Sequence, residues 1–489
     1  MLQHLFHLSP EADCSLQQQI REQISRAIIA GHIPPDIALP STRKLAEMLG
    51  VSRNTVILAY EHLLDDGYLV SRERAGFYVN PEILKSSARS DEQPAEAVRG
   101  NPPDWQRYLK HHPTAHKLNK LHRWRDYPYP FIYGQLDPKM FPTHHWRECC
   151  KESVTVQAIG EWAGDRYDDD DALLIEQIHS RLLPRRAVWA EPDEILITVG
   201  AQHGLYMLVQ LLLSKGSTFG LENPGYPDLT RMASYTGATT RPLQVDADGL
   251  QTGDQLRGCD LIFTTPSHQF PTTVTMPIER RRQLLEQASR DDFLIIEDDY
   301  ECETSFADNP TPALKSLDQN DRVIYLGSLS KTLSPGLRLG FIVGPKPLIR
   351  ELREFRRMML RHPPMNNQRA VGLFLARGYH DSLIRSIVQL YEDRWMAMRD
   401  ALQTCLPESA EPPVFGGSCY WVKGPDGLDA RELKRRALEK GVVIESGDIY
   451  YQQPDPPLNY FRLGYSSIET ARIGPGIDRL ADIIRTMSA

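Results

Sequence analysis

The sequence predicts a multidomain chain in which a small α+β unit at the N-terminus precedes a larger α/β domain and a smaller α/β lobe. Residues 15 to 80 carry closely spaced patterns of amphipathic helices. From about residue 130 onward, short β-rich apolar runs alternate with longer helical segments, which is typical of a largely parallel sheet. The 489 residues suffice for three compact units of ordinary size.

The boundaries follow from changes in composition along the chain. Residues 81 to 104 are polar, contain prolines and lack apolar periodicity, so they indicate a linker. We expect a first domain over residues 12–80, a linker over residues 81–129 and a body over residues 130–489. Within the body we expect a large lobe over about 130–346 and a smaller lobe over about 347–489, which opens with helices and continues with strands.

Net charge and cysteine usage limit the class of protein. The formal net charge of −8 argues against a protein that coats nucleic acid through bulk positive charge. Seven scattered cysteines without a C-x-x-C pair indicate reduced thiols, and therefore a cytoplasmic location. The longest strongly apolar stretch, residues 204–213, is too short to span a membrane, so we expect no membrane partner.

Two tandem helices in the N-terminal unit predict a helix-turn-helix. The expected helices are Thr42–Leu49 and Ser52–Asp65, and Gly50 separates them. Ser52 is placed to cap the second helix, whose first turn presents hydrogen-bonding side chains suited to a major groove. Expected strands at Gly67–Val70 and Gly76–Val79 form a wing. The positive side chains concentrate on the predicted contact surface: Arg43, Lys44, Arg53, Arg72 and Arg74.

Helix-turn-helix geometry also occurs in small helical domains that do not bind DNA, so the pattern alone leaves both interpretations open. The stretch LPSTRKLAEMLGVSRNTVILAYEHLLDDGYL, however, resembles the winged helix-turn-helix of the GntR family. The resemblance implies double-stranded promoter DNA as a partner. It implies DNA contacts from Arg43, Lys44, Ser52, Arg53, Asn54 and Thr55, with Arg72 and Arg74 in the wing.

A lysine in an unusual setting lies between two expected strands of the body. In YLGSLSKTLSPGLRLGFIVG, Lys331 stands among serines and glycines, with Arg338 seven residues later. An isolated lysine is usually a solvated surface charge. Here the loop allows backbone amides and hydroxyls to approach a phosphate, and the arginine adds a bidentate cation. The loop is not a Walker A motif.

A carboxylate cluster follows the strand in FLIIEDDYECE. A solvated loop or a Mg²⁺ or Mn²⁺ site formed by Glu297, Asp298, Asp299 and Glu301 is one interpretation. No histidine flanks the cluster to strengthen it, and we expect no metal. Pyridoxal phosphate is the other interpretation, because it needs a carboxylate to keep its ring nitrogen protonated and a phenol near its ring oxygen. Asp298 and Tyr300 fit these two requirements.

Together these motifs resemble the fold type I aminotransferases from about Phe131 to the C-terminus. The resemblance implies pyridoxal 5′-phosphate as cofactor, with Lys331 forming the Schiff base, Asp298 on the pyridinium and Tyr300 on the ring hydroxyl. It also implies further roles: Ala201, Gln202, Ser328 and Arg338 at the phosphate, Tyr226 stacked on the ring, Arg462 on an effector carboxylate, and Tyr167 at the phosphate of the neighbouring subunit.

Several of these assignments have structural alternatives. Tyr226 is equally compatible with core packing, and Arg462 with a bridge between the lobes. One departure from the family pattern is clear, because Phe270 replaces an Asn of the usual Asn-Pro-Thr-Gly motif. Tyr300 then carries more of the contact with the ring oxygen, which argues against efficient transamination. The sequence leaves open whether His268 takes the place of that Asn.

A GntR-type reader, a linker and an aminotransferase-like body in this order resemble the MocR/GabR family of transcriptional regulators. The resemblance implies a head-to-tail homodimer that senses an amino compound as an external aldimine at Lys331 and then changes its promoter binding. Two alternatives remain: a competent aminotransferase tethered to DNA, and a regulator whose body has lost the cofactor. The effector is open among amino acids, related anions such as γ-aminobutyrate or taurine, an amino-linked antibiotic, and pyridoxal phosphate alone.

Overall fold

The chain was analysed as a computed structural model. It describes residues 6–9, 14–72, 76–86, 103–111, 113, 121, 123–132, 136–305, 311–329, 331, 333–407 and 416–488. The chain divides into two compact units, Met1–Lys110 and His111–Ala489. Both lobes of the body belong to the second unit. The two units are described separately.

Each helix of the first unit turns an apolar side toward a common core. The elements are α1 (Leu16–Ile29), α2 (Thr42–Leu49), α3 (Arg53–Asp65) and an antiparallel hairpin of β1 (Leu69–Arg72) and β2 (Gly76–Val79). Buried side chains from all five elements form this core, among them Ile24, Leu45, Val56, Leu69 and Val79. The predicted winged helix-turn-helix is therefore confirmed. Two short helices follow, α4 (Pro81–Ser86) and α5 (Trp105–Tyr108).

The first strand of the wing begins two residues later than the sequence predicted. Gly67 adopts a left-handed backbone with a φ of 74°, and its N–H donates to the carbonyl of Leu64. The chain is therefore still leaving α3 at Gly67, and pairing with β2 begins at Leu69. As a consequence, Arg72 is the last residue of β1 and not part of the loop.

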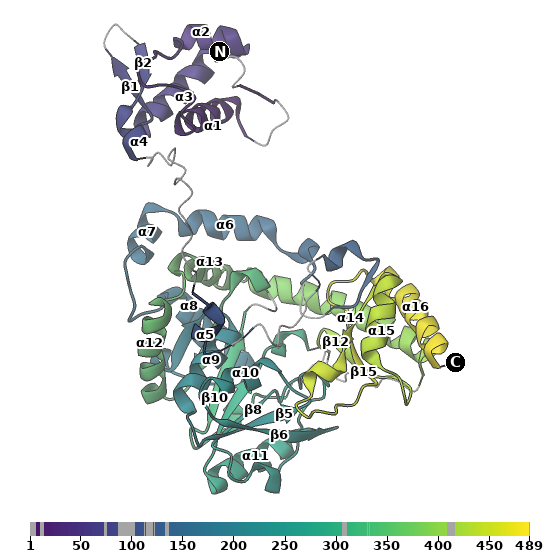
Figure 1. The fold of residues 1–489 in the computed structure, drawn as a ribbon. Coiled ribbons are helices and arrows are strands. Elements are labelled where there is room, and N and C mark those ends of the chain that lie inside the picture. Colours follow the sequence, from purple (N-terminus) through teal and green to yellow (C-terminus); the bar gives the residue numbers. More distant parts are fainter. Residues whose placement is uncertain are drawn as a thin grey trace. The chain divides into compact units, whose positions relative to one another are not determined.

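An eight-stranded sheet, in the order β4-β11-β10-β9-β8-β5-β6-β7, forms the centre of the second unit (Figure 1). Its strands are β4 (Ile195–Thr198), β5 (Thr218–Asn223), β6 (Thr239–Asp246), β7 (Gly249–Leu250), β8 (Leu261–Thr264), β9 (Leu294–Asp298), β10 (Val323–Ser328) and β11 (Gly340–Val343). Strands β6, β5, β8, β9 and β10 are parallel, whereas β11 is antiparallel to both neighbours. The largely parallel sheet was predicted. Because parallel strands end at one edge, Asp298 and Ser328 lie at the same edge.

Helices cover both faces of this sheet because side chains alternate along each strand. Leu326 of β10 packs with α9 (Ala201–Leu212), α10 (Asp228–Ser234) and α12 (Lys346–Leu360). Its neighbour Tyr325 packs on the other face with α8 (Ala172–Gln177), α13 (Met365–Ala376) and α14 (Tyr379–Cys405). That other face is also covered by α11 (Ile278–Asp291). Two further helices, α6 (Thr143–Ser153) and α7 (Val156–Trp162), pack against α13.

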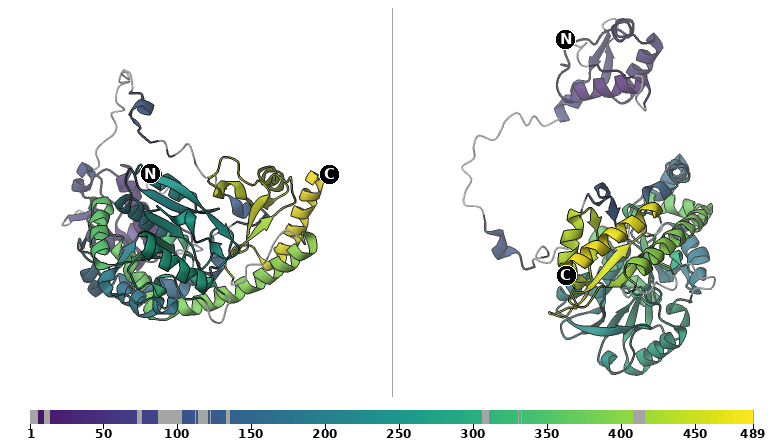
Figure 2. Two further views of the ribbon diagram at one scale, coloured as in Figure 1. Left: turned by 90° about the horizontal axis from the view of Figure 1, so that it is seen from below. Right: turned by 90° about the vertical axis from the view of Figure 1, so that its right-hand side faces the viewer.

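The smaller lobe contains a three-stranded antiparallel sheet in the order β12-β15-β14. Its strands are β12 (Cys419–Lys423), β14 (Glu445–Ser446) and β15 (Tyr460–Gly464), and its helices are α15 (Ala430–Glu439) and α16 (Thr470–Ser488). A two-stranded sheet of β3 (Tyr129–Pro130) and β13 (Val442–Val443) lies beside it. Figure 2 shows α14 running from the large lobe to α16, which it contacts. Although we expected this lobe to begin near residue 347, α12 packs on α9 and β4 of the large lobe.

All seven cysteines carry free thiols, as their scattered positions predicted. None of the helices among the described residues is both long and apolar enough to cross a membrane.

Candidate DNA interface and candidate cofactor site

The first turn of α3 is closed by a hydrogen-bonded serine and threonine. Ser52 Oγ accepts the N–H of Thr55 at 3.1 Å and lies 2.8 Å from Thr55 Oγ1. Arg53 and Asn54 lie between them and are exposed. The cap therefore engages Ser52 and Thr55 with each other, whereas Arg53 and Asn54 point into solvent.

The first turn of α2 and the wing carry the other predicted cations of the reader. Arg43 and Lys44 lie in the first turn of α2, where Ser41 Oγ accepts the N–H of Lys44 at 3.3 Å. In the wing, the guanidinium carbon of Arg72 lies 4.2 Å from the ring centroid of Tyr78 on the facing strand. This stacking holds the Arg72 cation at the exposed end of the hairpin. Arg74 lies outside the described residues.

Asp298 and Tyr300 present buried polar atoms at the end of β9. Asp298 Oδ1 and the hydroxyl of Tyr300 have no hydrogen-bond partner among the described residues. Lys331, in the turn after β10, places its Nζ 5.8 Å from the ring centroid of Tyr300. Burial raises the pKa of Asp298 to about 7, although the charge of Lys331 opposes the shift.

The other carboxylates of the EDDYE segment have partners of their own. Glu297 accepts two backbone N–H groups at 2.7 and 2.8 Å. Asp299 forms a buried ion pair with Arg186, with 2.7 Å between Oδ2 and Nε. Glu301 accepts a hydrogen bond from Ser418 Oγ at 2.5 Å. These carboxylates therefore do not converge on one cation, which removes the basis of the magnesium interpretation. Nothing in the sequence pointed to Arg186, which lies 113 residues before its partner.

A close approach of backbone segments forms a cradle at the N-terminus of α9. Gly200 precedes this helix with a φ of 74°, and no side chain caps the first turn. A Cβ on Gly200 would lie 2.8 Å from Arg338 Nη2, and a Cβ on Gly340 would lie 2.9 Å from the backbone nitrogen of Ala201. The uncapped turn and the Arg338 guanidinium thus face the same space, a combination that suits an anion. Ser328 is the last residue of β10, at the same edge of the sheet.

Asp228 joins two of the predicted cofactor residues, and sequence reasoning missed it. Its Oδ2 accepts hydrogen bonds from the Tyr226 hydroxyl at 3.1 Å and from Gln202 Nε2 at 3.2 Å. Asp228 stands at the first position of α10, two residues after Tyr226. This short spacing was the only signal in the sequence. The pKa of Tyr226 is raised by burial and by the Asp228 charge, so the phenol keeps its proton.

Arg462 is buried on the smaller lobe and faces aromatic rings. Its side chain lies in β15, is 1% exposed, and donates from Nε to Cys419 Sγ at 3.1 Å. Its guanidinium carbon lies 4.4 Å from the ring centroid of Phe270 and 5.9 Å from that of Tyr450. Phe270, the departure from the aminotransferase pattern, therefore supports the arginine by a cation–π contact.

His268 faces Glu301. Its Nε2 lies 3.3 Å from Glu301 Oε2, and its ring centroid lies 6.1 Å from that of Tyr300. Burial lowers the pKa of His268, and this effect together with the charge of Arg462 outweighs the opposing charge of Glu301, so the imidazole is neutral near pH 7. The role considered for His268 at a ring oxygen stays a hypothesis.

Tyr167 stands apart from the other predicted residues. It is 37% exposed, and its ring centroid lies 5.9 Å from the guanidinium carbon of Arg357 and 5.4 Å from that of Arg361, both in or next to the end of α12.

Comparison with known proteins assigns the family. Residues 16–79 match the family of bacterial regulatory proteins called gntR, and residues 167–480 match aminotransferase class I and II. The HTH-type transcriptional regulator TauR of Rhodobacter capsulatus is 41% identical over 485 residues, which cover 98% of this chain and 99% of TauR. The probable rhizopine catabolism regulatory protein MocR of Rhizobium meliloti is 33% identical over 489 residues, which cover 97% of this chain and 94% of MocR. The chain belongs to the MocR/GabR-type transcriptional regulators.

The body of this MocR/GabR-type regulator has the fold of class I and II aminotransferases. The kynurenine aminotransferase of Pyrococcus horikoshii superposes with a TM-score of 0.69 at 28% identity, covering 79% of this chain and 99% of the enzyme. LysN of Thermus thermophilus is an α-aminoadipate aminotransferase whose structure was solved with N-(5′-phosphopyridoxyl)-L-leucine. It superposes with a TM-score of 0.65 at 27% identity, covering 73% of this chain and 92% of LysN. The aminotransferases thus match the body, whereas TauR and MocR match the reader as well.

The aminotransferase fold implies pyridoxal 5′-phosphate, and the residues present fit this cofactor. The unpartnered Asp298 Oδ1 and Tyr300 hydroxyl are an acceptor for a ring N–H and a donor for a ring oxygen. In the cradle, Gly340 lies too close to the backbone nitrogen of Ala201 for a Cβ, and Arg338 borders Gly200, an arrangement that suits a phosphate.

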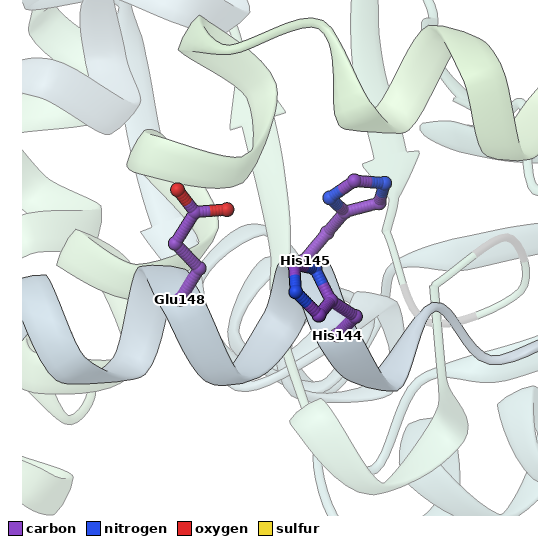
Figure 3. Close-up of side chains that lie close together, drawn as sticks. All are labelled: His144, His145 and Glu148. Atoms are coloured by element: carbon purple, nitrogen blue, oxygen red, sulfur yellow. The ribbon is translucent and has the colours of Figure 1, made fainter.

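One cluster of metal-ligand type lies elsewhere in the described part of the body, on α6 (Figure 3). His144, His145 and Glu148 bring one ligand atom each within 4.8 Å of the others. However, Glu148 accepts a hydrogen bond from Tyr379 at 2.9 Å and pairs with Arg377 at 3.2 Å, and His145 stacks on Tyr379 at 4.0 Å. These contacts fasten α6 to the junction of α13 and α14, which explains the cluster without a metal ion.

Proposed function

We propose that this regulator senses a primary amino compound at a pyridoxal 5′-phosphate held by Lys331 and that the compound changes its affinity for double-stranded promoter DNA. The observation that carries the proposal is the pair of buried, unpartnered polar atoms on Asp298 and Tyr300, beside Lys331, in a chain that also contains a winged helix-turn-helix. Buried polar atoms normally have partners, so these two, which lie together beside Lys331, support a ligand at this point.

The bound cofactor supplies an aldehyde that condenses with primary amines, and a ring that withdraws electrons. Lys331 holds the cofactor through its amine, and it is the side chain that an effector amine replaces. Asp298 holds a proton at the ring nitrogen, and Tyr300 donates to the ring oxygen. Tyr226, oriented by Asp228, covers one face of the ring. The phosphate is bound by a group of polar residues, namely Ala201, Gln202, Ser328 and Arg338.

Arg462 restricts the effector to compounds with an anionic end. A guanidinium that is 1% exposed and faces aromatic rings gains most from a carboxylate or a similar anion in bidentate contact. The effector is therefore an amino acid or another small amino compound with an acidic group.

The reader contacts DNA through the exposed ends of α2 and α3 and through the wing. The residues are Arg43, Lys44, Ser52, Arg53, Asn54, Thr55, Arg72 and Arg74. The active form is a head-to-tail homodimer in which Tyr167 reaches the phosphate site of the partner subunit. The exposure of Tyr167 supports this, because within one chain its ring lies beside two surface arginines, Arg357 and Arg361. Seven free thiols support a cytoplasmic location.

The test is a cofactor and DNA titration of the full chain and of Lys331→Ala. The wild-type protein should show a visible absorbance band that shifts when the effector binds, and Lys331→Ala should lack the band. Fluorescence anisotropy of labelled promoter DNA should then report an effector-dependent affinity in the wild type only. A colourless wild-type protein that cannot be reconstituted with pyridoxal 5′-phosphate would refute the cofactor assignment.

The same samples separate a regulator from an enzyme. If the protein steadily converts an amino donor and a keto acid over many turnovers, the tethered aminotransferase is the better description. The contact between Phe270 and Arg462 favours the regulator, because Phe270 occupies the position of a polar aminotransferase residue.

A further inference from the structure

The two lobes are joined beside the candidate site by a set of hydrogen bonds that we call the interlobe clamp. The backbone N–H of Gly225 donates to the carbonyl of Tyr450 at 2.9 Å. The backbone N–H of Gln452 donates to Asn223 Oδ1 at 2.9 Å, and Asn223 Nδ2 donates to Gln453 Oε1 at 2.7 Å. The clamp therefore connects the end of β5 to residues 450–453 of the smaller lobe, and relative movement of the lobes changes its geometry.

One end of the clamp borders the residue proposed to bind the effector anion. The Tyr450 ring centroid lies 5.9 Å from the guanidinium carbon of Arg462 and 5.2 Å from the ring centroid of Phe270. An anion that binds Arg462 changes the charge beside the Tyr450 ring, and Tyr450 also provides the carbonyl acceptor of the clamp.

The other end of the clamp leads directly into α10. Tyr226 follows Gly225, and Asp228, the first residue of α10, binds both Tyr226 and Gln202. The seven-residue helix is held by the buried side chains Leu229, Met232 and Ala233. A short, packed helix moves as one body, so a displacement at Asp228 also reaches its far end.

The far end of α10 contacts His111, which lies within the predicted linker of residues 81–129. Tyr235 is the C-terminal cap residue of α10, and its ring lies edge-to-face against that of His111, with 4.7 Å between centroids and an interplanar angle of 83°. His111 is exposed and is the first residue of the second compact unit.

We propose that α10 couples the effector site to the linker, with Tyr235 as the docking point for His111. This rests on the proposed function, because it assigns a route to the sensing described above. Occupancy at Arg462 and Lys331 changes the clamp, α10 shifts with Asp228, and the preferred contact of His111 with Tyr235 changes. The coupling is reciprocal, so DNA binding shifts effector affinity by the same factor.

The experiment compares four variants of the full holoprotein with aminooxyacetate as the probe. Its terminal nitrogen replaces Lys331 on the cofactor aldehyde carbon and releases the lysine amine, while its carboxylate suits Arg462. Tyr235→Ala and His111→Ala remove the ring contact, Tyr235→Phe keeps it, and His144→Ala replaces an exposed histidine on α6 away from this route. Cofactor absorbance reports probe binding, and anisotropy of labelled promoter DNA reports the response.

An edge-to-face ring pair corresponds to about a two- to tenfold change in an equilibrium constant. We therefore expect Tyr235→Ala and His111→Ala to bind the probe like the wild type. The change in DNA affinity that the probe causes should be about two- to tenfold smaller in these variants than in the wild type. Tyr235→Phe and His144→Ala should respond like the wild type.

Two outcomes overturn the proposal, and they can be told apart. If Tyr235→Ala and His111→Ala keep the full change in DNA affinity, α10 is not the route, although the sensing function stands. If the wild-type absorbance or DNA affinity does not respond to the probe, the proposed function fails, and this route fails with it. His111 is exposed, so loss of folding does not explain a result obtained with His111→Ala.

Discussion

Replacing Asp298 by Asn should stabilise the body without cofactor, and increasingly so as the pH rises. Burial raises the pKa of Asp298 from 3.8 to about 7. Between these pH values the folded state holds the proton more tightly than the unfolded state, so the free energy of unfolding falls as the pH rises. The shift corresponds to roughly 4 kcal/mol in total, at about 1.4 kcal/mol per pH unit. Between pH 5 and 8 we expect about 2–3 kcal/mol, because only the interval from pH 5 to about 7 contributes to the change.

The assay is urea unfolding of cofactor-free wild type and Asp298→Asn at pH 5 and pH 8, followed by tryptophan fluorescence. All seven tryptophans lie beyond residue 104, so the signal does not report on the winged helix-turn-helix. The difference in unfolding free energy should grow in favour of Asp298→Asn as the pH rises. With pyridoxal 5′-phosphate bound, the wild type should have the higher unfolding free energy of the two proteins, because the ring nitrogen pairs with the Asp298 carboxylate. Parallel pH profiles for the two cofactor-free proteins would refute this reasoning.

Three further substitutions test other parts of the chain. Arg53→Ala should weaken specific promoter binding by about 1–3 kcal/mol if Arg53 makes a bidentate base contact, and an unchanged affinity and footprint would remove it from the interface. Arg462→Ala should raise the effector concentration for half-maximal absorbance change by about tenfold or more while the cofactor band persists, because a charge-assisted contact is lost. An equal response to effectors with and without an acidic group would contradict this. Arg186→Ala should lower the unfolding free energy of the body by about 3–5 kcal/mol, because Asp299 remains buried without its partner. The double variant Arg186→Met with Asp299→Leu should recover most of this loss. A urea midpoint of Arg186→Ala equal to that of the wild type would contradict the prediction.

The parts that the sequence predicted well depend on local interactions. Helix α2 has the predicted bounds and α3 begins directly after the predicted cap, because Ser52 and Thr55 lie one turn apart and form the cap themselves. Asp298 and Ser328 could be placed at one edge because each ends a short apolar run, and parallel pairing aligns such runs.

The parts that the sequence did not predict depend on contacts between distant residues. Arg186 and Asp299 form a buried pair across 113 residues, and neither position shows a pattern that names the other. The interlobe clamp joins Asn223 to residues about 230 positions later through one side-chain amide. The sequence likewise could not predict that α12 packs on the large lobe, because an amphipathic pattern predicts a buried face without indicating which surface covers it.

The adjacent residues Asp298 and Asp299 show how environment, and not residue type, assigns a carboxylate to the candidate site. Both lie at the end of β9. Burial alone would raise the pKa of each, but the Arg186 ion pair lowers the pKa of Asp299, whereas the charge of Lys331 does not outweigh the burial of Asp298. Asp299 is therefore paired within the fold through its Oδ2, which binds Arg186 and the Tyr325 hydroxyl. Asp298 costs stability until a cation or an N–H group arrives, so the ligand that restores it must bring a proton donor to this point.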